Sequence, residues 1–399
     1  MELYGLPGGA LENYIFPNNV HVEWSLMIVI YPYITGLIAG AFVVSSMYHV
    51  FGVKEFKPIA NFSLIVAFCF ALFAGVPLLV HLGQPQRAYQ IYTTPHLTSA
   101  MSIFGYVYTS YLILLMIEIW VIYRKHFIEM ANTDKGPLKW VWPILTLGIT
   151  KYNPQSAPHD KKFAKFLAGI GIPWACLLHG YVGFLFGSVK AVAWWATPLQ
   201  PFIFLSSAIV SGMAMLFVMY IVIMWAKGRD YDENLVKKFM ISLWMAFILD
   251  YSLELLELAF VSYEHGLHWA QIKPLLLGPL YNSYVLGQMG LLSISPLLIL
   301  GTVSLLDIRG KALIYLSSLG SLMLVFQVLM MRFNVVVGGQ LISKSERGFV
   351  DYQWEFLTRE GLFPAMLIMA APFVAYYIIS RFIPIFEGKS MDTEPRKTS

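Results

Sequence analysis

The sequence contains very little cysteine. Only Cys69 and Cys176 occur among its 399 residues, and more than one hundred positions separate them. No CxxC or CxxCH spacing exists, so the chain cannot by itself supply four thiolates to an iron–sulfur cluster or attach a c-type haem. A framework of structural disulfide bonds is excluded for the same reason.

Charged residues are also scarce. They make up 13% of the chain against 58% hydrophobic residues, which is too little charge to cover a soluble surface of this length. The 27 Lys and Arg against 23 Asp and Glu leave a net charge of +4, too weak to indicate a nucleic-acid partner. The 23 Tyr and 11 Trp are typical of a protein at a lipid–water boundary. The composition therefore predicts an integral membrane protein.

Nine apolar stretches are long enough to span a membrane as helices. The hydrocarbon core is roughly 30 Å thick and needs about 20 apolar residues per helix. We predict an all-α polytopic membrane protein with an external leader at 1–23, a transmembrane domain at 24–386 and a cytoplasmic tail at 387–399. The leader lacks the basic region of a cleaved signal peptide. The predicted spans are 24–51, 59–81, 99–123, 163–187, 199–226, 239–262, 279–306, 312–337 and 362–386.

The distribution of Lys and Arg predicts the orientation. With nine spans, 20 of the basic residues fall on one side, six fall on the other, and Arg332 lies within a span. Because basic residues accumulate in cytoplasmic loops, we expect the N-terminus outside and the C-terminus in the cytoplasm. The 13-residue segment 138–150 contains Pro143 and is too short to cross, so we interpret it as interfacial or re-entrant.

Ionisable side chains within the spans are the candidates for function, because each is costly at membrane depth. Asp250, Glu254 and Glu257 are spaced i, i+4 and i+7, which places them on one face of a helix. They could form a proton relay, or a structural pair with a cation such as Arg332. Glu118, near the inner end of the third span, would give a proton pathway its cytoplasmic end.

Histidine and tyrosine side chains gather near the outer ends of the spans. His81 could bind a quinone headgroup, ligate a haem or lie at the membrane interface. His179 and Tyr181 could hold the two oxygens of a quinone, or could bond neighbouring helices. Bis-histidine haem ligation needs facing histidines at matched depth, and only His81 with His179 qualifies, so we expect no haem.

Four stretches resemble the NrfD and polysulfide-reductase family of membrane subunits. His-Leu-Gly-Gln-Pro-Gln-Arg at 81–87 is similar to the HLGxPxR pattern that ends the family's second helix. Trp24 with 36–41 resembles its first helix, and 179–183 leading to 198–201 resembles its HGYxG region. The segment 332–340 is similar to the RWNVVxGGQ stretch of a long-chain branch associated with sulfite reduction.

This resemblance implies a fold, a cofactor and partners. The fold would be two four-helix bundles, with one extra helix here, and the cofactor would be a non-covalent menaquinone near the outer face, without haem or an iron–sulfur cluster in this chain. An external ferredoxin-like iron–sulfur subunit would exchange electrons with that site, alongside other membrane and cytochrome subunits. In the first helix, Tyr31 stands where one branch has a quinone-binding histidine. The candidate quinone residues are His81, Arg87, His179, Tyr181, Arg332, Asn334, Tyr31 and His21.

The sequence thus favours a non-autonomous subunit of a quinone-linked oxidoreductase complex in the cytoplasmic membrane. It would oxidise menaquinol in sulfate or sulfite respiration, and proton movement could be coupled to that chemistry. We expect the titratable and phenolic side chains to share one cavity beneath the outer surface. The alternative is an ion- or proton-conducting transporter that uses Asp250, Glu254, Glu257 and Glu118.

Overall fold

The computed structural model describes residues 22–386 except 135, 137–138 and 344–347. The predicted cytoplasmic tail and all but two residues of the predicted leader lie outside the described residues, and so does His21. The described chain is helical and contains no strand, apart from one isolated antiparallel bridge between Ile342 and Phe349. This confirms the all-α prediction for the part of the chain that the structure covers.

Nine helical segments of the described chain are long and apolar enough to cross a membrane, in agreement with the predicted number. Short helices lie in the connections: η2 (Lys54–Phe56), η3 (Pro85–Arg87), α4 (Gln90–Thr93), α6 (Val141–Leu145), η4 (Pro154–Ser156), α10 (Leu267–Leu277) and η6 (Gly338–Gln340). The spanning segments are α1 (Leu26–His49), α2 (Lys57–Phe73) with α3 (Val76–His81), α5 (Ala100–Thr133), α7 (Ala157–Gly187), α8 (Gln200–Ala226), α9 (Glu233–Glu264), η5 (Tyr281–Leu291) with α11 (Leu292–Leu305), α12 (Gly310–Val336) and α13 (Leu362–Ile379).

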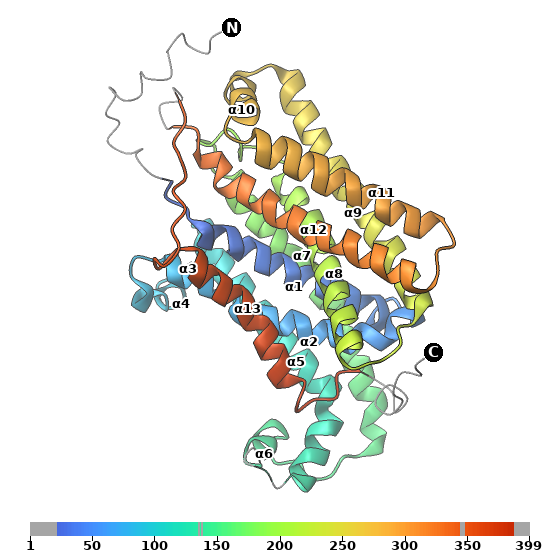
Figure 1. Cartoon of the computed structure of the whole chain (residues 1–399). Coiled ribbons are helices and arrows are strands. Elements are labelled where there is room, and N and C mark those ends of the chain that lie inside the picture. The colour runs from blue at the N-terminus through green and yellow to red at the C-terminus, as the bar shows by residue number, and fades with distance from the viewer. Residues whose placement is uncertain (1–21, 135, 137–138, 344–347, 387–399) are drawn as a thin grey trace.

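The spanning helices form two packed groups with one additional helix. In the first group, α1 packs against α2 and α7, and α5 packs against α2 and α7. In the second, α8 and α11 both pack against α9 and α12. Helix α8 also contacts α1 and α7, so it joins the groups, while α13 packs against α2. Helices α3, α4 and α10 lie at one end of the bundle and α6 at the other (Figure 1).

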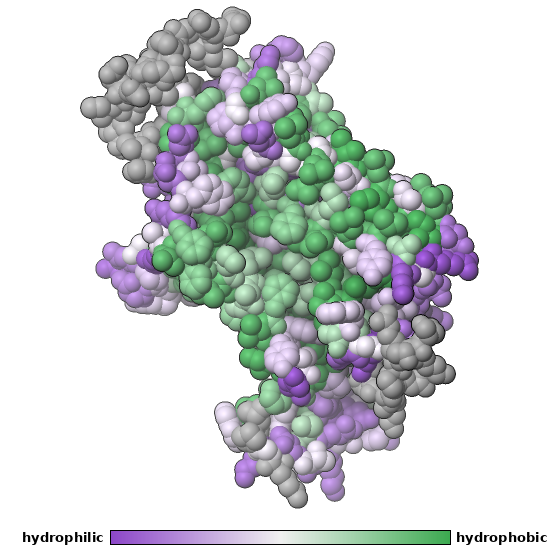
Figure 2. Space-filling model, in the orientation of Figure 1, coloured by the Kyte–Doolittle hydropathy of each residue, from purple (hydrophilic) through white to green (hydrophobic). Residues whose placement is uncertain are grey.

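Apolar side chains cover the middle of the molecule's outer surface. Figure 2 shows a hydrophobic band across the visible face, with hydrophilic residues gathered at both ends. Large exposed side chains on the spanning helices include Leu249, Phe260, Leu298 and Phe326. Such contiguous apolar exposure is expected where the surrounding medium is lipid. The fold is therefore that of a multi-pass membrane protein.

Three spans differ in detail from the predicted helices. The second span is interrupted at 74–75, because Pro77 has no N–H with which to continue the hydrogen-bond ladder. The ninth helix ends at Ile379 rather than at position 386. The seventh span begins as the 11-residue π-helix η5 before becoming α-helical at Leu292. In the described part of this segment, residues 139–150, the five-residue α6 is the helix present, in agreement with the prediction that the segment does not cross.

Two glycines allow α1 and α8 to approach closely. A Cβ atom added to Gly40 would lie 2.6 Å from the Cα of Gly212 and 2.8 Å from the carbonyl oxygen of Ala208. Both obstacles are backbone atoms, so they cannot move aside without separating the helices. Small residues commonly permit this kind of contact between membrane helices.

We therefore expect Gly40→Ala to destabilise the subunit by about 1–3 kcal/mol through overpacking. A lower melting temperature of the detergent-purified protein would be the readout. Gly169→Ala is the matched control, because a Cβ at this helical position meets no heavy atom within 4 Å. A melting temperature for Gly40→Ala equal to that of the control would contradict the proposed close packing.

Candidate functional sites

His81 ends α3 and forms a hydrogen-bonded dyad with a carboxylate. Its Nδ1 atom lies 2.8 Å from Oε2 of Glu360, and Ser25 donates a hydrogen bond to the same carboxylate oxygen. Ser25 is the N-cap of α1, and Glu360 comes two residues before α13, so the dyad joins three separate parts of the chain. Within the described residues, Nε2 of His81 has no hydrogen-bond partner.

Arg359 holds the end of α3 in place beside this dyad. Its guanidinium donates to the backbone carbonyls of Leu79 and Leu82, at 3.2 and 2.8 Å. These are carbonyls that the end of a helix leaves without an internal partner. The segment before α13 therefore supplies both the carboxylate that binds His81 and the cation that caps its helix.

Aromatic side chains from α1, α5 and α7 lie in contact at the same end of the bundle. The ring of Phe104 packs edge-on against Tyr31, with centroids 5.4 Å apart, and stacks with Tyr181 at 6.4 Å. Tyr181 donates a hydrogen bond to the carbonyl of Ala100, whereas the buried hydroxyl of Tyr31 has no partner among the described residues. The Tyr31 hydroxyl is thus a buried polar group without an assigned contact.

Arg332 and His179 lie together between the two helix groups. Arg332 is fully buried, its Nη2 lies 3.2 Å from Nε2 of His179, and it donates to Ser207 at 2.6 Å and to the carbonyl of Phe204 at 3.1 Å. The guanidinium also stacks over the Phe204 ring, 3.9 Å from its centroid. This cluster ties α7, α8 and α12 together by charge-assisted hydrogen bonds.

Asp250 and Glu254 of α9 accept hydrogen bonds from neutral side chains and do not form an ion pair with Arg332. Asp250 accepts a hydrogen bond from Ser206 at 2.6 Å. Glu254 accepts from Gln288 at 2.9 Å and from Gln327 at 3.4 Å, and Asn334 donates to the Gln288 carbonyl oxygen at 2.9 Å. Gln288 and Gln327 were not among the predicted residues, because neither side chain is ionisable. The sequence feature that could have identified them is the presence of a polar amide side chain within an apolar helix.

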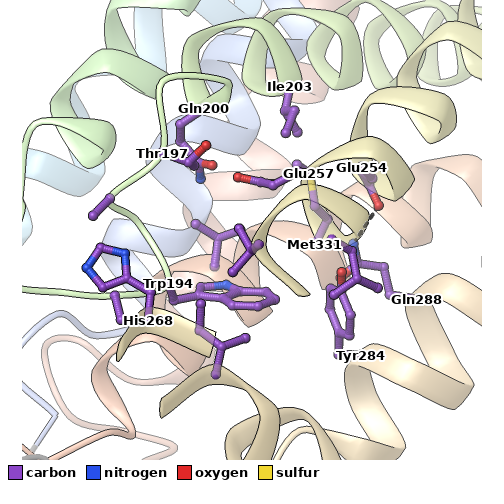
Figure 3. A pocket seen from close by; sticks show the side chains of 16 residues that line it. Trp194, Thr197, Gln200, Ile203, Glu254, Glu257, His268, Tyr284, Gln288 and Met331 are labelled. Atoms are coloured by element: carbon purple, nitrogen blue, oxygen red, sulfur yellow. Dashed lines mark hydrogen bonds between the residues drawn. The ribbon is translucent and has the colours of Figure 1, made fainter. Parts of the chain in front are cut away.

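A pocket opens beside these carboxyl groups, and we call it the α9 pocket (Figure 3). Its interior has about 50 Å³ of space for water-sized groups, and its mouth is open. Trp194 and Tyr284 form an aromatic wall, with ring centroids 5.2 Å apart and planes nearly perpendicular. The remaining lining residues come from 193–203, α9, α10, η5 and α12: Ala193, Ala196, Thr197, Gln200, Ile203, Glu254, Glu257, Leu258, Val261, His268, Ile272, Gln288, Met331 and Val335.

Of the predicted site residues that the structure describes, only Glu254 and Glu257 line the α9 pocket. The candidate quinone residues lie elsewhere. Arg87 is exposed in η3. Glu118 is buried in α5, both of its carboxyl oxygens lack partners in the described chain, and α5 does not pack against α9 there. The expectation of one shared cavity beneath the outer surface stays a prediction, because sequence gives a residue's depth along a helix but not the direction in which it points.

The helical bundle and its buried polar clusters define a polytopic membrane protein with polar chemistry inside its apolar spans. The chain belongs to the family described as polysulphide reductase, NrfD, which matches residues 16–344. This match confirms the family resemblance predicted from the four sequence motifs.

Three relatives illustrate the range of this similarity. The chain is 34% identical over 324 residues to the C subunit of the selenate reductase of Mesobacillus selenatarsenatis, covering 79% of this chain and 73% of that protein. It is 26% identical over 317 residues to a Halobacterium salinarum protein named for a proposed role as a membrane subunit of dimethyl sulfoxide reductase, covering 79% and 68%. It is 25% identical over 217 residues to the Hdr-like menaquinol oxidoreductase integral membrane subunit of Archaeoglobus fulgidus, covering 54% and 46%.

Proposed function

We propose that this chain is the quinone-interacting membrane subunit of a redox complex and that it oxidises menaquinol near His81. The observation that carries the proposal is the His81–Glu360 dyad at the helix end. A carboxylate that binds one imidazole nitrogen fixes the orientation of the ring and leaves the other nitrogen available as a general base. Quinol oxidation requires such a proton acceptor.

The aromatic group of Tyr31, Phe104 and Tyr181 would supply the contacts to the quinone headgroup in this proposal. Tyr31 offers a buried hydroxyl without a partner among the described residues, and Tyr181 and Phe104 offer aromatic surfaces next to it. Menaquinol supplies two electrons and two protons when it is oxidised. His81 would take one proton on Nε2 while Glu360 holds the ring through Nδ1, and the second proton would pass to water at the partly exposed dyad. Tyr31 and Tyr181 would orient the headgroup by hydrogen bonding and ring contact.

The other predicted quinone residues have more distant roles in this proposal. Arg332 and His179 form a buried contact between helices, with Asn334 bonded to Gln288 nearby. We assign them to the support of the site rather than to direct quinone contact. Arg87 is exposed at the same end as His81 and would attract negative charge or contact a partner subunit.

The expected partner subunits are inferred from where the electrons must go and from the names of the relatives. Two cysteines cannot hold a four-thiolate cluster, so electrons would leave to an iron–sulfur centre in another chain. The three relatives are named as subunits of a selenate reductase, of a dimethyl sulfoxide reductase and of a menaquinol oxidoreductase. We propose an external ferredoxin-like iron–sulfur partner, with further membrane and cytochrome subunits.

The orientation and the respiratory pathway are also part of the proposal. The excess of basic residues in one set of loops supports an external N-terminus and a cytoplasmic C-terminus in the cytoplasmic membrane. The similarity of 332–340 to DsrP, the membrane subunit of the DsrMKJOP complex, and to its relative in the Hme complex supports a role in sulfate or sulfite respiration. The name of the relative from M. selenatarsenatis supports an oxyanion as the final electron acceptor.

Proton movement is a second candidate function, supported by the polar groups of α9. Glu257 lines the α9 pocket, Glu254 is bonded to Gln288 and Gln327, and Asp250 follows one turn deeper. This series would carry protons between the pocket and the interior of the bundle. Glu118 would belong to a separate path through the first helix group, since α5 and α9 do not pack together in the described chain.

The test is quinol turnover by the purified complex with and without this subunit. We expect the complete complex to oxidise a short-chain menaquinol analogue. The complex lacking this chain should react only with soluble dyes that reduce the iron–sulfur partner directly. Equal quinol oxidation by both preparations would contradict the proposal. Ion flux through the isolated chain in liposomes, without partners or quinol, would support the transporter alternative instead.

A further inference from the structure

The apolar band of the surface ends close to Trp120 at the end of the bundle that carries α6 (Figure 1). Trp120 follows Ala100, the first residue of α5, by 20 positions, which is about 30 Å along a helix and equals the thickness of the hydrocarbon core. Its indole donates a hydrogen bond to the carbonyl of Leu145 at 2.6 Å. Ile144 and Leu147 beside this contact are 64% and 74% exposed, as expected for large apolar side chains that meet lipid.

Helix α7 reaches the same level at Leu167. The side chains of Leu167 and Val121 belong to one small apolar cluster, against which Trp120 also packs. Because α7 begins at Ala157 near the α6 end, the residues before Leu167 lie toward the polar end of the molecule. The residues after Leu167 lie within the apolar band.

Three lysines occupy the exposed face of α7 at this level, and we call them the α7 lysines: Lys161, Lys162 and Lys165. They precede Leu167 by about 3–9 Å along the helix axis, which is the depth of the lipid headgroups. The neighbouring Asp160 is paired with Arg124 at 2.9 Å. None of the α7 lysines takes part in an ion pair within the described chain, so their three positive charges are not neutralised there.

The same face of α7 continues into the apolar band as a surface with a gap. Gly169 follows Lys165 by four residues and Phe166 by three, so it lies on the same side of the helix. A Cβ atom added to Gly169 would meet no heavy atom within 4 Å. Phe166 and Ile170 beside it are 60% and 37% exposed. Open space with apolar neighbours therefore lies directly below the α7 lysines.

We propose that this face of α7 binds an anionic phospholipid, with the phosphate group between the α7 lysines and an acyl chain over Gly169. A phospholipid joins a negative group to a hydrocarbon chain, which matches the order of lysines and apolar surface along the helix. Free phosphate would contact the lysines but would leave the apolar surface uncovered. Quinol chemistry is not involved, because His81 ends α3 at the opposite end of the bundle (Figure 1).

A photoactivatable phosphatidylglycerol with a diazirine in its acyl chain tests this site. The full-length chain is reconstituted in phosphatidylethanolamine vesicles with a small fraction of the probe, and mass spectrometry of chymotryptic peptides locates the label. We expect label within 163–172, at least tenfold above that from the same diazirine in phosphatidylethanolamine. The triple variant Lys161→Gln/Lys162→Gln/Lys165→Gln should lower this label at least tenfold, because each lysine near an anionic headgroup contributes about fivefold.

The matched control is Lys125→Gln/Lys139→Gln/Lys151→Gln, which removes three exposed lysines at the same end of the bundle. It should leave the label within 163–172 unchanged. Gly169→Leu fills the gap without changing the charge, and it should also lower the label. This second variant keeps the test independent of any effect that the charge change has on folding.

Three results would overturn the lipid site. The first is equal labelling within 163–172 by the phosphatidylglycerol and phosphatidylethanolamine probes. The second is an equal loss of label in the α7 lysine variant and in the control. The third is loss of another subunit from the complex of the α7 lysine variant while its labelling stays unchanged, which would assign the lysines to an acidic protein partner.

Discussion

Replacing His81 with glutamine is expected to lower the rate of menaquinol oxidation by the assembled complex about 100-fold. Glutamine retains a polar side chain that can hydrogen-bond to Glu360, but an amide does not accept a proton at neutral pH. General-base catalysis typically contributes a factor of about 10² to 10⁴, so this loss is the lower end of that range. The measurement is steady-state oxidation of a menaquinol analogue by purified complex.

A histidine in the connection that follows α3 provides the control for this variant. His96 is exposed, and its Nδ1 bonds only to the hydroxyl of Thr98, so His96→Gln should leave turnover unchanged. Glu360→Gln should give an intermediate rate with an unchanged KM, because it orients His81 without contacting the quinol, and Glu360→Asp should restore part of the lost kcat. Equal turnover in His81→Gln and His96→Gln would remove His81 from the mechanism.

The second large effect is expected for Arg332→Leu, which should prevent stable assembly of the subunit. The substitution removes the donor to Ser207, to the carbonyl of Phe204 and to His179, all of which are buried. Each hydrogen bond to a charged group contributes about 1.5–3 kcal/mol. The sum is comparable to the whole stability of many folded domains. The readout is the amount of full-length chain recovered in the complex after mild detergent extraction.

One further variant separates charge from geometry at this position, and a second variant elsewhere is its control. Arg332→Lys keeps the positive charge but lacks the planar set of donors, so we expect partial recovery. Arg381→Leu is the matched control, because Arg381 is exposed and contacts only the nearby Tyr377 among the described residues. Recovery of Arg332→Leu at the level of Arg381→Leu would show that the buried cluster does not stabilise the fold.

Much of the fold could be predicted from composition and apolar length. Backbone polar groups must be satisfied inside lipid, so an apolar run of sufficient length has one stable conformation. The predicted spans therefore lie on the observed helices, although α5, α7 and α9 continue beyond the apolar part, where charged residues still permit helical structure. The π-helix was not predicted, because it depends on contacts with other helices such as that of Tyr251 with the carbonyl of Met289.

The sites were less predictable than the fold. The spacing of Asp250, Glu254 and Glu257 correctly places two of them at one pocket, since helical periodicity fixes a shared face. The partner of His81 could not be found in the same way. Glu360 lies 279 residues away in a connection, where no periodic pattern exists to indicate which side chain it meets. Arg332 and His81 were grouped by similar depth, but they have different partners: Arg332 contacts His179 and Ser207, and His81 contacts Glu360.

The π-helix η5 restricts the insertions and deletions that this segment of the chain can tolerate. Tyr284 and Gln288 both project from it toward the α9 pocket, and Ser293 donates to the carbonyl of Gln288 five residues earlier. Deleting one residue between 281 and 287 would allow ordinary α-helical winding, but it would rotate the residues on one side of the deletion by about 100° relative to the rest. Gln288 and the pocket wall could then not both keep their present directions. Relatives that share this pocket should consequently tolerate substitutions in η5 more readily than insertions or deletions.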